Sequence, residues 1–266
     1  MEFLEKKART HRGRKHLEAY KPRAEEGPRR ALLTQGSKTS ALALDALGFF
    51  ARLLRARATR LNTRYETKPF EASQLLLRLC EKHRCPLFLF ASNSRKRPNR
   101  LALGRVFDYR LLELVEFEVL RLEGAFSALN RVAAHQRVVF LALGDALEND
   151  ERLRRLRGVF HDLFTCREQT AVNLNESFGL AVALVALSGE ELRLTVYRRE
   201  GPRLVELGLA LVLRVARAEL CDSAALEEAC RQPKRPKGPL RRPHRVPRRP
   251  QPVQVRRPPV RRRLSV

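Results

Sequence analysis

A cluster of cations between residues 94 and 100 is the part of this sequence best suited to binding a ligand. Four basic residues fall within six positions: Arg95, Lys96, Arg97 and Arg100. The apolar runs on either side, Pro86–Ala91 and Leu101–Phe107, predict two buried strands that would hold this segment as a loop. Cations held close together repel one another unless an anion neutralises them, and arginine and lysine both suit phosphate oxygens. We therefore expect the loop to bind a polyphosphate backbone; a solvated loop without a ligand is the alternative.

The segment that begins at Gly36 places Lys38 and neighbouring hydroxyls between a predicted strand and a predicted helix. A nucleotide-binding phosphate loop requires a glycine, four further residues and then Gly-Lys-Ser/Thr. Here Ser37 separates Gly36 from Lys38, and Ala31 stands where the first glycine would be, so we do not expect NTP binding. Lys38 at a helix N-terminus is still suited to one backbone phosphate. Simple capping of the helix by Ser37 or Thr39 is the alternative.

The rest of the sequence contains no catalytic or metal-binding set of residues that we can recognise. Cys80 and Cys85 resemble half of a zinc site, but a structural zinc ion needs four ligands, and no second cysteine pair has suitable spacing. We expect these two cysteines to pack at the end of a helix. Asp108 and Glu113 are close in sequence, yet Asp108 suits a turn or a buried hydrogen bond. We therefore expect no catalytic residue, no metal and no cofactor.

Cysteine usage and charge constrain the compartment and the partners. Five cysteines, an odd number in a long chain without a recognisable secretion signal, indicate reduced thiols in an intracellular protein. No apolar run reaches the length of a membrane-spanning helix. The formal net charge of +25 favours nucleic acid or an anionic membrane surface. Only 6% of the residues are aromatic, so we expect recognition of RNA phosphates and shape rather than of stacked bases.

The charge divides the chain into three parts. Residues 1–30 carry a net charge of +5 and are expected to form a basic arm. Candidate RNA contacts in this arm are Arg12, Arg14 and Lys15. Residues 31–230 carry +6 and form the predicted globular domain. Residues 231–266 carry +14, no acidic residue and nine of the fifteen prolines, which predicts an extended, disordered, Arg/Pro-rich tail.

Short apolar strands and amphipathic helices alternate through the central domain, in an order that occurs twice. In the first half we predict strands at Ala31–Thr34, Leu87–Phe90 and Leu101–Phe107, a helix around Leu47, Phe50 and Leu54, and a helix around Leu75, Leu76 and Leu79. The segment Leu112–Leu120 fits either a strand or a short helix. In the second half we predict a strand at Val138–Leu143, a helix around Leu153, Leu156, Phe160 and Leu163, a hairpin of Phe178–Leu187 and Glu191–Tyr197, a strand through Leu209–Val215 and a helix over Asp222–Cys230. The order indicates an α/β (α+β) fold with two similar halves, about 31–110 and 111–230.

Five short motifs occur in this sequence in order: Ala31–Ser40, Lys68–Glu71, Leu87–Phe90, Lys96–Asn99 and Gly104–Tyr109. With this order and spacing the chain closely resembles the Brix-domain family of eukaryotic ribosome assembly factors, over roughly residues 1–230. The resemblance implies two halves that are each similar to the anticodon-binding domains of some aminoacyl-tRNA synthetases. It also implies a protein without enzymatic activity. The Arg/Pro-rich tail does not match a family pattern residue by residue.

The resemblance further implies the partners and the compartment. Together with the protein called regulator of ribosome synthesis, such a factor would bring 5S rRNA and the ribosomal proteins of its particle to the large-subunit (60S) precursor, in the nucleolus of the nucleus. The basic loop, Lys38 and the arm would contact 5S rRNA and precursor rRNA. The exposed face of the hairpin, with Arg193 and Tyr197, would dock the protein partner. The alternative is a nuclear protein-binding scaffold whose basic tail binds RNA without specificity. We expect no membrane partner.

Overall fold

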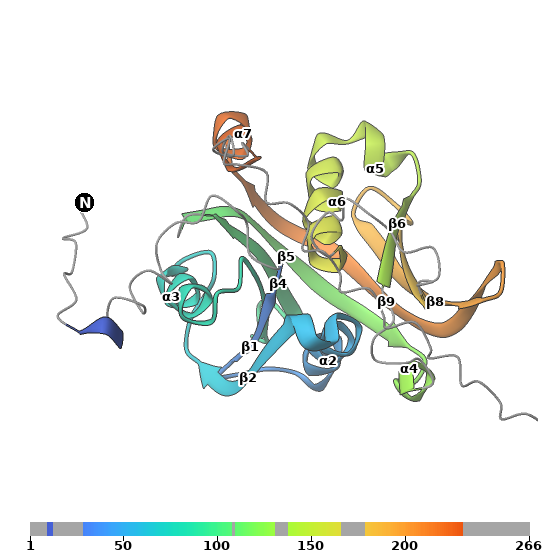
Figure 1. Cartoon of the computed structure of the whole chain (residues 1–266), viewed down its shortest axis with the longest axis horizontal. Coiled ribbons are helices and arrows are strands. Elements are labelled where there is room, and N and C mark those ends of the chain that lie inside the picture. The colour runs from blue at the N-terminus through green and yellow to red at the C-terminus, as the bar shows by residue number, and fades with distance from the viewer. Residues whose placement is uncertain (1–9, 13–28, 108–109, 131–137, 166–178, 231–266) are drawn as a thin grey trace, which may run out of the picture. The chain divides into compact units, whose positions relative to one another are not determined.

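The computed structural model describes residues 10–12, 29–107, 110–130, 138–165 and 179–230 (Figure 1). One nine-stranded sheet runs through the central domain, in the order β2-β1-β3-β4-β5-β9-β8-β7-β6. Its strands are β1 (Ala31–Gly36), β2 (Ala58–Tyr65), β3 (Leu87–Ser92), β4 (Arg100–Phe107), β5 (Arg110–Glu123), β6 (Val138–Leu143), β7 (Leu180–Ala186), β8 (Glu191–Glu200) and β9 (Arg203–Leu220). The helices are α2 (Ala41–Leu54), α3 (Gln74–His83), α4 (Ser127–Asn130), α5 (Ala146–Asn149), α6 (Glu151–Phe164) and α7 (Ser223–Cys230), with a 3-10 turn at Arg55–Arg57. Within the described ranges, no helix is both long and apolar enough to span a bilayer.

The sheet contains one strand pattern twice. In the first repeat β1 is parallel to β3, and β3, β4 and β5 follow in antiparallel pairing. In the second repeat β6 is parallel to β7, and β7, β8 and β9 follow in the same way. Helix α2 comes after β1, and α6 occupies the corresponding place after β6. The predicted α/β fold of two similar halves is therefore confirmed, and the undecided segment Leu112–Leu120 lies in a strand, β5.

The two repeats meet where β5 pairs antiparallel with β9, in a ladder that runs from the pair Glu113–Leu220 to the pair Glu123–Ala210. Because β5 also pairs with β4 along most of its length, it belongs to the pattern of the first repeat. We therefore propose that the first half extends through Glu123, beyond the division at about residue 110 that the sequence predicted.

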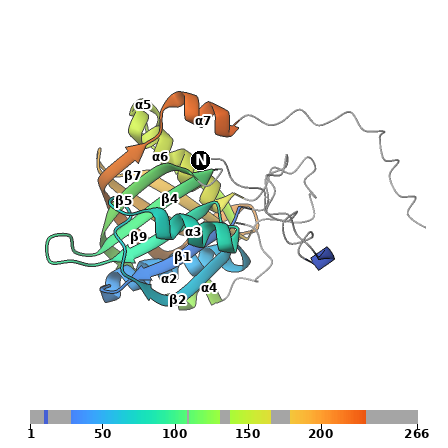
Figure 2. The ribbon, with the colours of Figure 1, turned by 90° about the vertical axis from the view of Figure 1, so that its left-hand side faces the viewer.

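The first repeat differs from the second by an insertion, β2 and α3. Strand β2 pairs with β1 and forms one edge of the sheet; no strand was predicted at these residues. Helix α3 lies on the near side of the sheet in Figure 2. Beneath it Leu76, Cys80 and Cys85 pack against Phe88 and Phe90 of β3 in a small core. The packing role predicted for the two cysteines is therefore confirmed.

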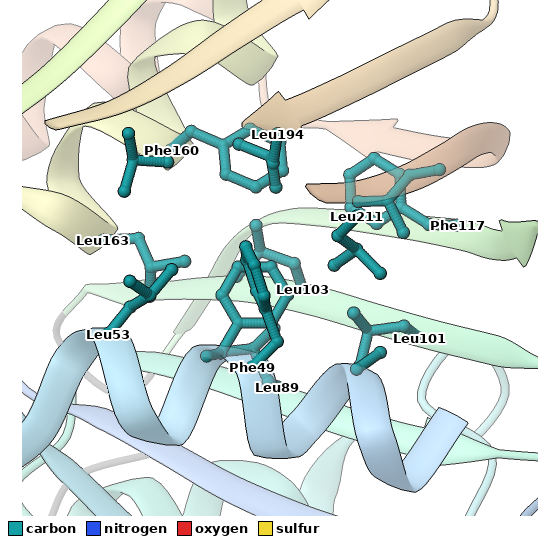
Figure 3. Close-up of a cluster of buried hydrophobic side chains, with 14 of the residues drawn as sticks. Phe49, Leu53, Leu89, Leu101, Leu103, Phe117, Phe160, Leu163, Leu194 and Leu211 are labelled. Atoms are coloured by element: carbon teal, nitrogen blue, oxygen red, sulfur yellow. The ribbon is translucent and has the colours of Figure 1, made fainter. Parts of the chain in front are cut away.

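The larger core lies on the other face of the sheet, where α2 and α6 pack. Successive side chains of β3 point to opposite faces of the sheet. Leu89 belongs to this larger core, whereas Phe88 and Phe90 belong to the small one. Figure 3 shows side chains of α2, α6 and strands of both repeats gathered in this core. Phe50 of α2 stacks on Phe164 of α6, with ring centroids 6.1 Å apart. The two repeats therefore share a single core and are not independent domains.

Polar contacts also join α6 to the first repeat. Arg57 donates hydrogen bonds to the carbonyl oxygens of Leu163 and Phe164, at 3.1 and 2.8 Å, and so caps the last turn of α6. Asp162 of α6 accepts a hydrogen bond from Arg105 of β4 at 2.7 Å. Arg105 also pairs with Glu113 at 2.6 Å. Burial raises the pKa of Glu113, although Arg105 acts in the opposite direction.

Candidate nucleic-acid interface

The basic loop of the sequence analysis is a hairpin connection from β3 to β4. Ser92 pairs with Arg100, so residues 93–99 form the loop. The backbone amide and carbonyl groups of Ser94 and Arg97 bond to each other, at 3.0 and 3.1 Å. The side-chain oxygen of Asn93 accepts a hydrogen bond from the amide of Asn99 at 3.1 Å. Asn99 has a φ of 50°, a left-handed conformation that asparagine tolerates better than most residues. The loop backbone is thus supported by its own polar contacts.

Three of the four predicted loop cations point into solvent. Arg95, Lys96 and Arg97 are exposed. Within the described residues no carboxylate forms an ion pair with any of them, and their side chains bond to no other group. The nearby acid Glu71 bonds instead to Lys68 at 2.8 Å. That hydrogen bond lowers the pKa of Glu71, and Arg97 acts in the same direction over a longer distance. The three loop cations therefore remain available to an external anion.

Arg100 is placed differently from the other three. It is the first residue of β4, where it pairs across the strands with Glu118 of β5. Its side chain is only 13% exposed and lies 3.7 Å from the carboxylate of Glu118. Spacing in the sequence could not separate a strand residue from a loop residue here. We therefore leave Arg100 out of the candidate interface.

The structure brings Lys38 next to the basic loop. The carbonyl oxygen of Lys38 accepts a hydrogen bond from the amide of Asn93 at 2.8 Å. This contact arises because β1 and β3 are parallel neighbours, so the segments that follow them leave the sheet at the same end. The side chain of Lys38 is exposed and has no ion pair in the part of the chain that the structure describes.

The cap of α2 is Ser40, whose hydroxyl accepts a hydrogen bond from the amide of Ala43 at 3.2 Å. The prediction of Ser37 or Thr39 was wrong. The hydroxyl of Thr39 donates instead to the carbonyl oxygen of Gly36 at 3.1 Å, which closes the turn between β1 and α2. The helix begins later than the pattern of hydroxyls indicated.

A further exposed arginine, missed by the sequence analysis, lies beside Lys38. Arg64 of β2 pairs with Gln35 of β1, and the carbonyl oxygen of the next residue, Tyr65, accepts a hydrogen bond from the amide of Ser37 at 3.1 Å. The available signal was weak, because the apolar residues of β2, Ala58, Leu61 and Tyr65, do not alternate regularly with its polar residues. We define the basic surface by five exposed residues of three adjoining segments: Lys38, Arg64, Arg95, Lys96 and Arg97.

The arginines in the middle of the sheet differ from the cations of the basic surface, because they pair with acids. On the strands β4, β5, β8 and β9, five arginines and five glutamates join in ion pairs, which we call the charge ladder: Arg100, Arg121, Arg193, Arg214, Arg217, Glu116, Glu118, Glu123, Glu191 and Glu206. Arg193, predicted to lie on the exposed face that docks a partner, is 3.0 Å from Glu123 and 3.6 Å from Glu206. Tyr197 is half-buried on β8, and Phe178 lies outside the described residues. The charge ladder has no net charge.

The remaining predicted contacts lie at the ends of the chain. Arg12 is exposed. Arg14 and Lys15 lie outside the described residues, and so does the segment 231–266.

The motif that begins at Gly104 has a structural explanation. Gly104 pairs with Phe88 of β3, and a Cβ atom at this position would lie 2.2 Å from the ring of Phe88. The next residue, Arg105, forms ion pairs with the buried Glu113 and the half-buried Asp162. Asp108 and Tyr109 lie outside the described residues. The described part of this motif therefore supports packing and contributes no group to the basic surface.

Two of the cysteines are buried, and the described residues contain no cluster suited to a metal ion. Cys80 and Cys85 are each 2% exposed, and burial raises the pKa of both thiols, which leaves them un-ionised and unreactive. Within the described ranges, no group of three His, Cys, Asp or Glu residues is arranged to hold a metal ion.

The chain was compared with protein families, curated proteins and solved structures. The Brix domain model matches residues 36–217. The chain is 32% identical to the ribosome production factor 2 homolog of Arabidopsis thaliana over 247 residues, which cover 85% of this chain and 77% of that protein. It is 28% identical to the protein of the same name from Caenorhabditis elegans over 239 residues, 86% of this chain and 80% of that protein. A crystal structure of a probable ribosomal biogenesis protein from Aeropyrum pernix K1 aligns with a TM-score of 0.45 at 16% identity, over 73% of this chain and 99% of that one.

Proposed function

The chain belongs to the Brix-domain family and has a role in ribosome biogenesis, and from this premise we propose that it binds 5S rRNA and helps to bring the 5S particle to the 60S precursor. The observation that carries the proposal is the basic surface. Five exposed cations converge there from three segments, without an ion pair inside the described ranges. In the charge ladder, by contrast, the arginines are already neutralised by acids. A surface that keeps its cations unpaired favours a polyanionic ligand.

Recognition at this surface would depend on the RNA backbone. Guanidinium and ammonium groups suit phosphate oxygens. The phenylalanines of β3, Phe88 and Phe90, are buried, and Tyr65 and Phe70 are half-buried and pack against the small core. A platform for stacked bases needs exposed rings, so contacts to phosphates and to the shape of folded RNA would carry the affinity. Precursor rRNA of the large subunit would be bound in the same way.

The protein partner would dock on the charge ladder rather than on the basic surface. A surface with balanced charges gives no general attraction for RNA, but a partner with complementary charges can exchange ion pairs with it and gain specificity. The partner is the regulator of ribosome synthesis, with the ribosomal proteins of the 5S particle joining the complex. The protein would act as a non-enzymatic assembly factor in the nucleolus and support maturation of the large-subunit rRNA.

The test of RNA binding is the triple variant R95A/K96A/R97A. All three side chains are exposed, and a surface substitution usually changes the free energy of unfolding by only about 0.5 kcal/mol, so the variant should fold. Each lost phosphate contact should lower the slope of log affinity against log salt by about one unit. We expect much weaker binding to a 5S rRNA transcript and a slope reduced by roughly three units, measured by filter binding across a KCl series.

The matched control is R78A/K82A/R152A, which also removes three exposed cations but leaves the basic surface intact. Its 5S rRNA affinity should stay close to that of the wild type. If the folded loop variant keeps wild-type affinity and salt slope, the loop faces another ligand. In that case the alternative of a scaffold with an RNA-binding tail would be favoured.

A further inference from the structure

Edge strand β2 carries an irregularity next to the basic surface. Arg60 pairs with Leu33 of β1, whereas Arg64 pairs with Gln35. Three residues of β2 therefore lie opposite a single residue of β1, which is a β-bulge. The side chain of Gln35 donates a hydrogen bond to the carbonyl oxygen of Asn62 at 2.9 Å, inside the bulge. Bulges of this kind occur often at sheet edges and near functional sites, where they re-aim side chains.

The bulge brings two arginines together. Their partners on β1 are two residues apart, and a strand rises about 3.3 Å per residue, so Arg60 and Arg64 lie about 7 Å from each other along the strand. In a regular strand, four residues of separation would place them about 13 Å apart. Leu33 and Gln35 are on the same face of β1, so both arginine side chains emerge on one face of the sheet.

Both arginines are exposed, and neither forms an ion pair within the described part of the chain. Charged residues on an edge strand have a simpler explanation, because they prevent pairing with another sheet. That explanation requires charge but not two arginines drawn together by a bulge. It also does not require continuity with the basic surface, which β2 has through the hydrogen bond between the amide of Ser37 and the carbonyl oxygen of Tyr65.

We propose that Arg60 and Arg64 bind two successive phosphates of one RNA strand, which passes from the basic surface along the edge of the sheet. Each guanidinium presents two parallel N–H groups to one phosphate, and the separation of about 7 Å from the strand geometry is close to that of neighbouring phosphates in a nucleic-acid strand. This inference rests on the proposed function and adds to it the path of the RNA backbone.

The test uses the full-length chain and a 5S rRNA transcript. In R60Q/R64Q both side chains stay polar but lose their charge. We expect roughly tenfold weaker binding near 150 mM KCl and a salt slope lower by about two units, with half of the slope change in each single variant. R60K/R64K should keep the slope but lose part of the affinity, because lysine lacks the planar fork. The matched control R152Q/R203Q removes two exposed arginines from the second repeat and should leave both quantities unchanged.

Three outcomes would separate the explanations. If R60Q/R64Q changes only the oligomeric state in size-exclusion chromatography and keeps its RNA affinity, the arginines protect the edge and the inference is overturned. If R60Q/R64Q binds RNA normally while R95A/K96A/R97A binds it weakly, the proposed path of the RNA along β2 is wrong but the proposed function stands. If both variants bind normally, both proposals fail. Should R60Q/R64Q misfold, an unchanged affinity of the folded R60K/R64K would overturn the proposal that Arg60 and Arg64 bind two successive phosphates.

Discussion

Gly104 is a position at which the fold leaves no room for a side chain. The ring of Phe88 covers the position where a Cβ atom would lie, at 2.2 Å, and Phe88 is itself fully buried. A close-packed interior can relieve such an overlap only by displacing neighbours. The substitution should therefore act on stability, while the exposed cations of the basic surface keep their places.

We expect Gly104→Ala to lower the free energy of unfolding by roughly 1–3 kcal/mol, the usual cost of overpacking, and to leave the RNA affinity of the folded protein unchanged. Urea denaturation followed by circular dichroism measures the first quantity. The control is Gly189→Ala in the β7–β8 hairpin, where a Cβ atom would meet nothing within 4 Å. Equal denaturation midpoints for the two variants would contradict the packing argument.

The candidate site was predictable residue by residue only in part. The exposed cations Arg95, Lys96 and Arg97 followed from their position between two apolar runs. Arg100 could not be separated from them, because the boundary between loop and strand depends on the pairing with Glu118. The position of Lys38 beside the loop depends on the parallel pairing of β1 with β3. Contacts between segments that are distant in the chain cannot be deduced from the local spacing of residue types.

Helix α6 belongs to the second repeat, but a residue of the first repeat holds its C-terminal end in place. The guanidinium of Arg57 bonds to two carbonyl oxygens at the end of this helix, Leu163 at 3.1 Å and Phe164 at 2.8 Å. The last carbonyl groups of a helix have no partner within it, so the arginine satisfies groups that would otherwise need water. The cap therefore connects the repeats as well as ending the helix.

We expect Arg57→Ala to lower the free energy of unfolding by roughly 1.5–3 kcal/mol, the range for hydrogen bonds with a charged partner. Amide hydrogen exchange should become faster in the last turn of α6 before it changes elsewhere. Arg154→Ala is a matched control, because Arg154 also donates two hydrogen bonds to a carbonyl oxygen, that of Glu148 at 3.0 and 2.7 Å, but in an exposed position within one repeat. A larger loss of stability in the control would show that the contact between repeats is unimportant.

The predicted elements were those with strong periodicity. Helices α2 and α6 and strands β3 and β7 bury a regular set of apolar residues, and such patterns are visible without neighbours. Strand β2 was missed because an edge strand buries little, and its exposed residues carry no alternation. The duplication was visible as an order of elements. The place where the repeats join depended on the β5–β9 ladder, which the sequence does not reveal.

At the scale of the whole molecule, most of the charge lies outside the globular domain. Residues 31–230 carry +6 of the total of +25, and residues 231–266 carry +14. Charge on a Pro-rich segment without acids attracts any nucleic acid through release of counterions. The selectivity for one RNA should therefore reside in the globular domain, and the segment 231–266 should add affinity without preference.

We expect removal of residues 231–266 to flatten the salt dependence of RNA binding, because the fourteen cations of this segment are lost. The ratio of affinities for 5S rRNA and for an unrelated RNA of equal length should stay within about twofold of the full-length value. Competition binding at fixed ionic strength measures this ratio. A truncated chain that binds both RNAs equally would show that the segment 231–266 itself distinguishes 5S rRNA from the unrelated RNA.

The β5–β9 ladder has a consequence for synthesis on the ribosome. Strand β5 ends at Glu123, but β9 begins only at Arg203. At a synthesis rate of about 5–20 residues per second, the edge of β5 therefore stays unpaired for about 4–16 seconds. An open strand edge is a template for another chain, and several nascent copies grow on one messenger. Glu116 and Glu118 lie along this edge, and like charges on two nascent chains repel each other. The same glutamates, which later pair with arginines of β9, therefore place negative charge along this edge while it is still open.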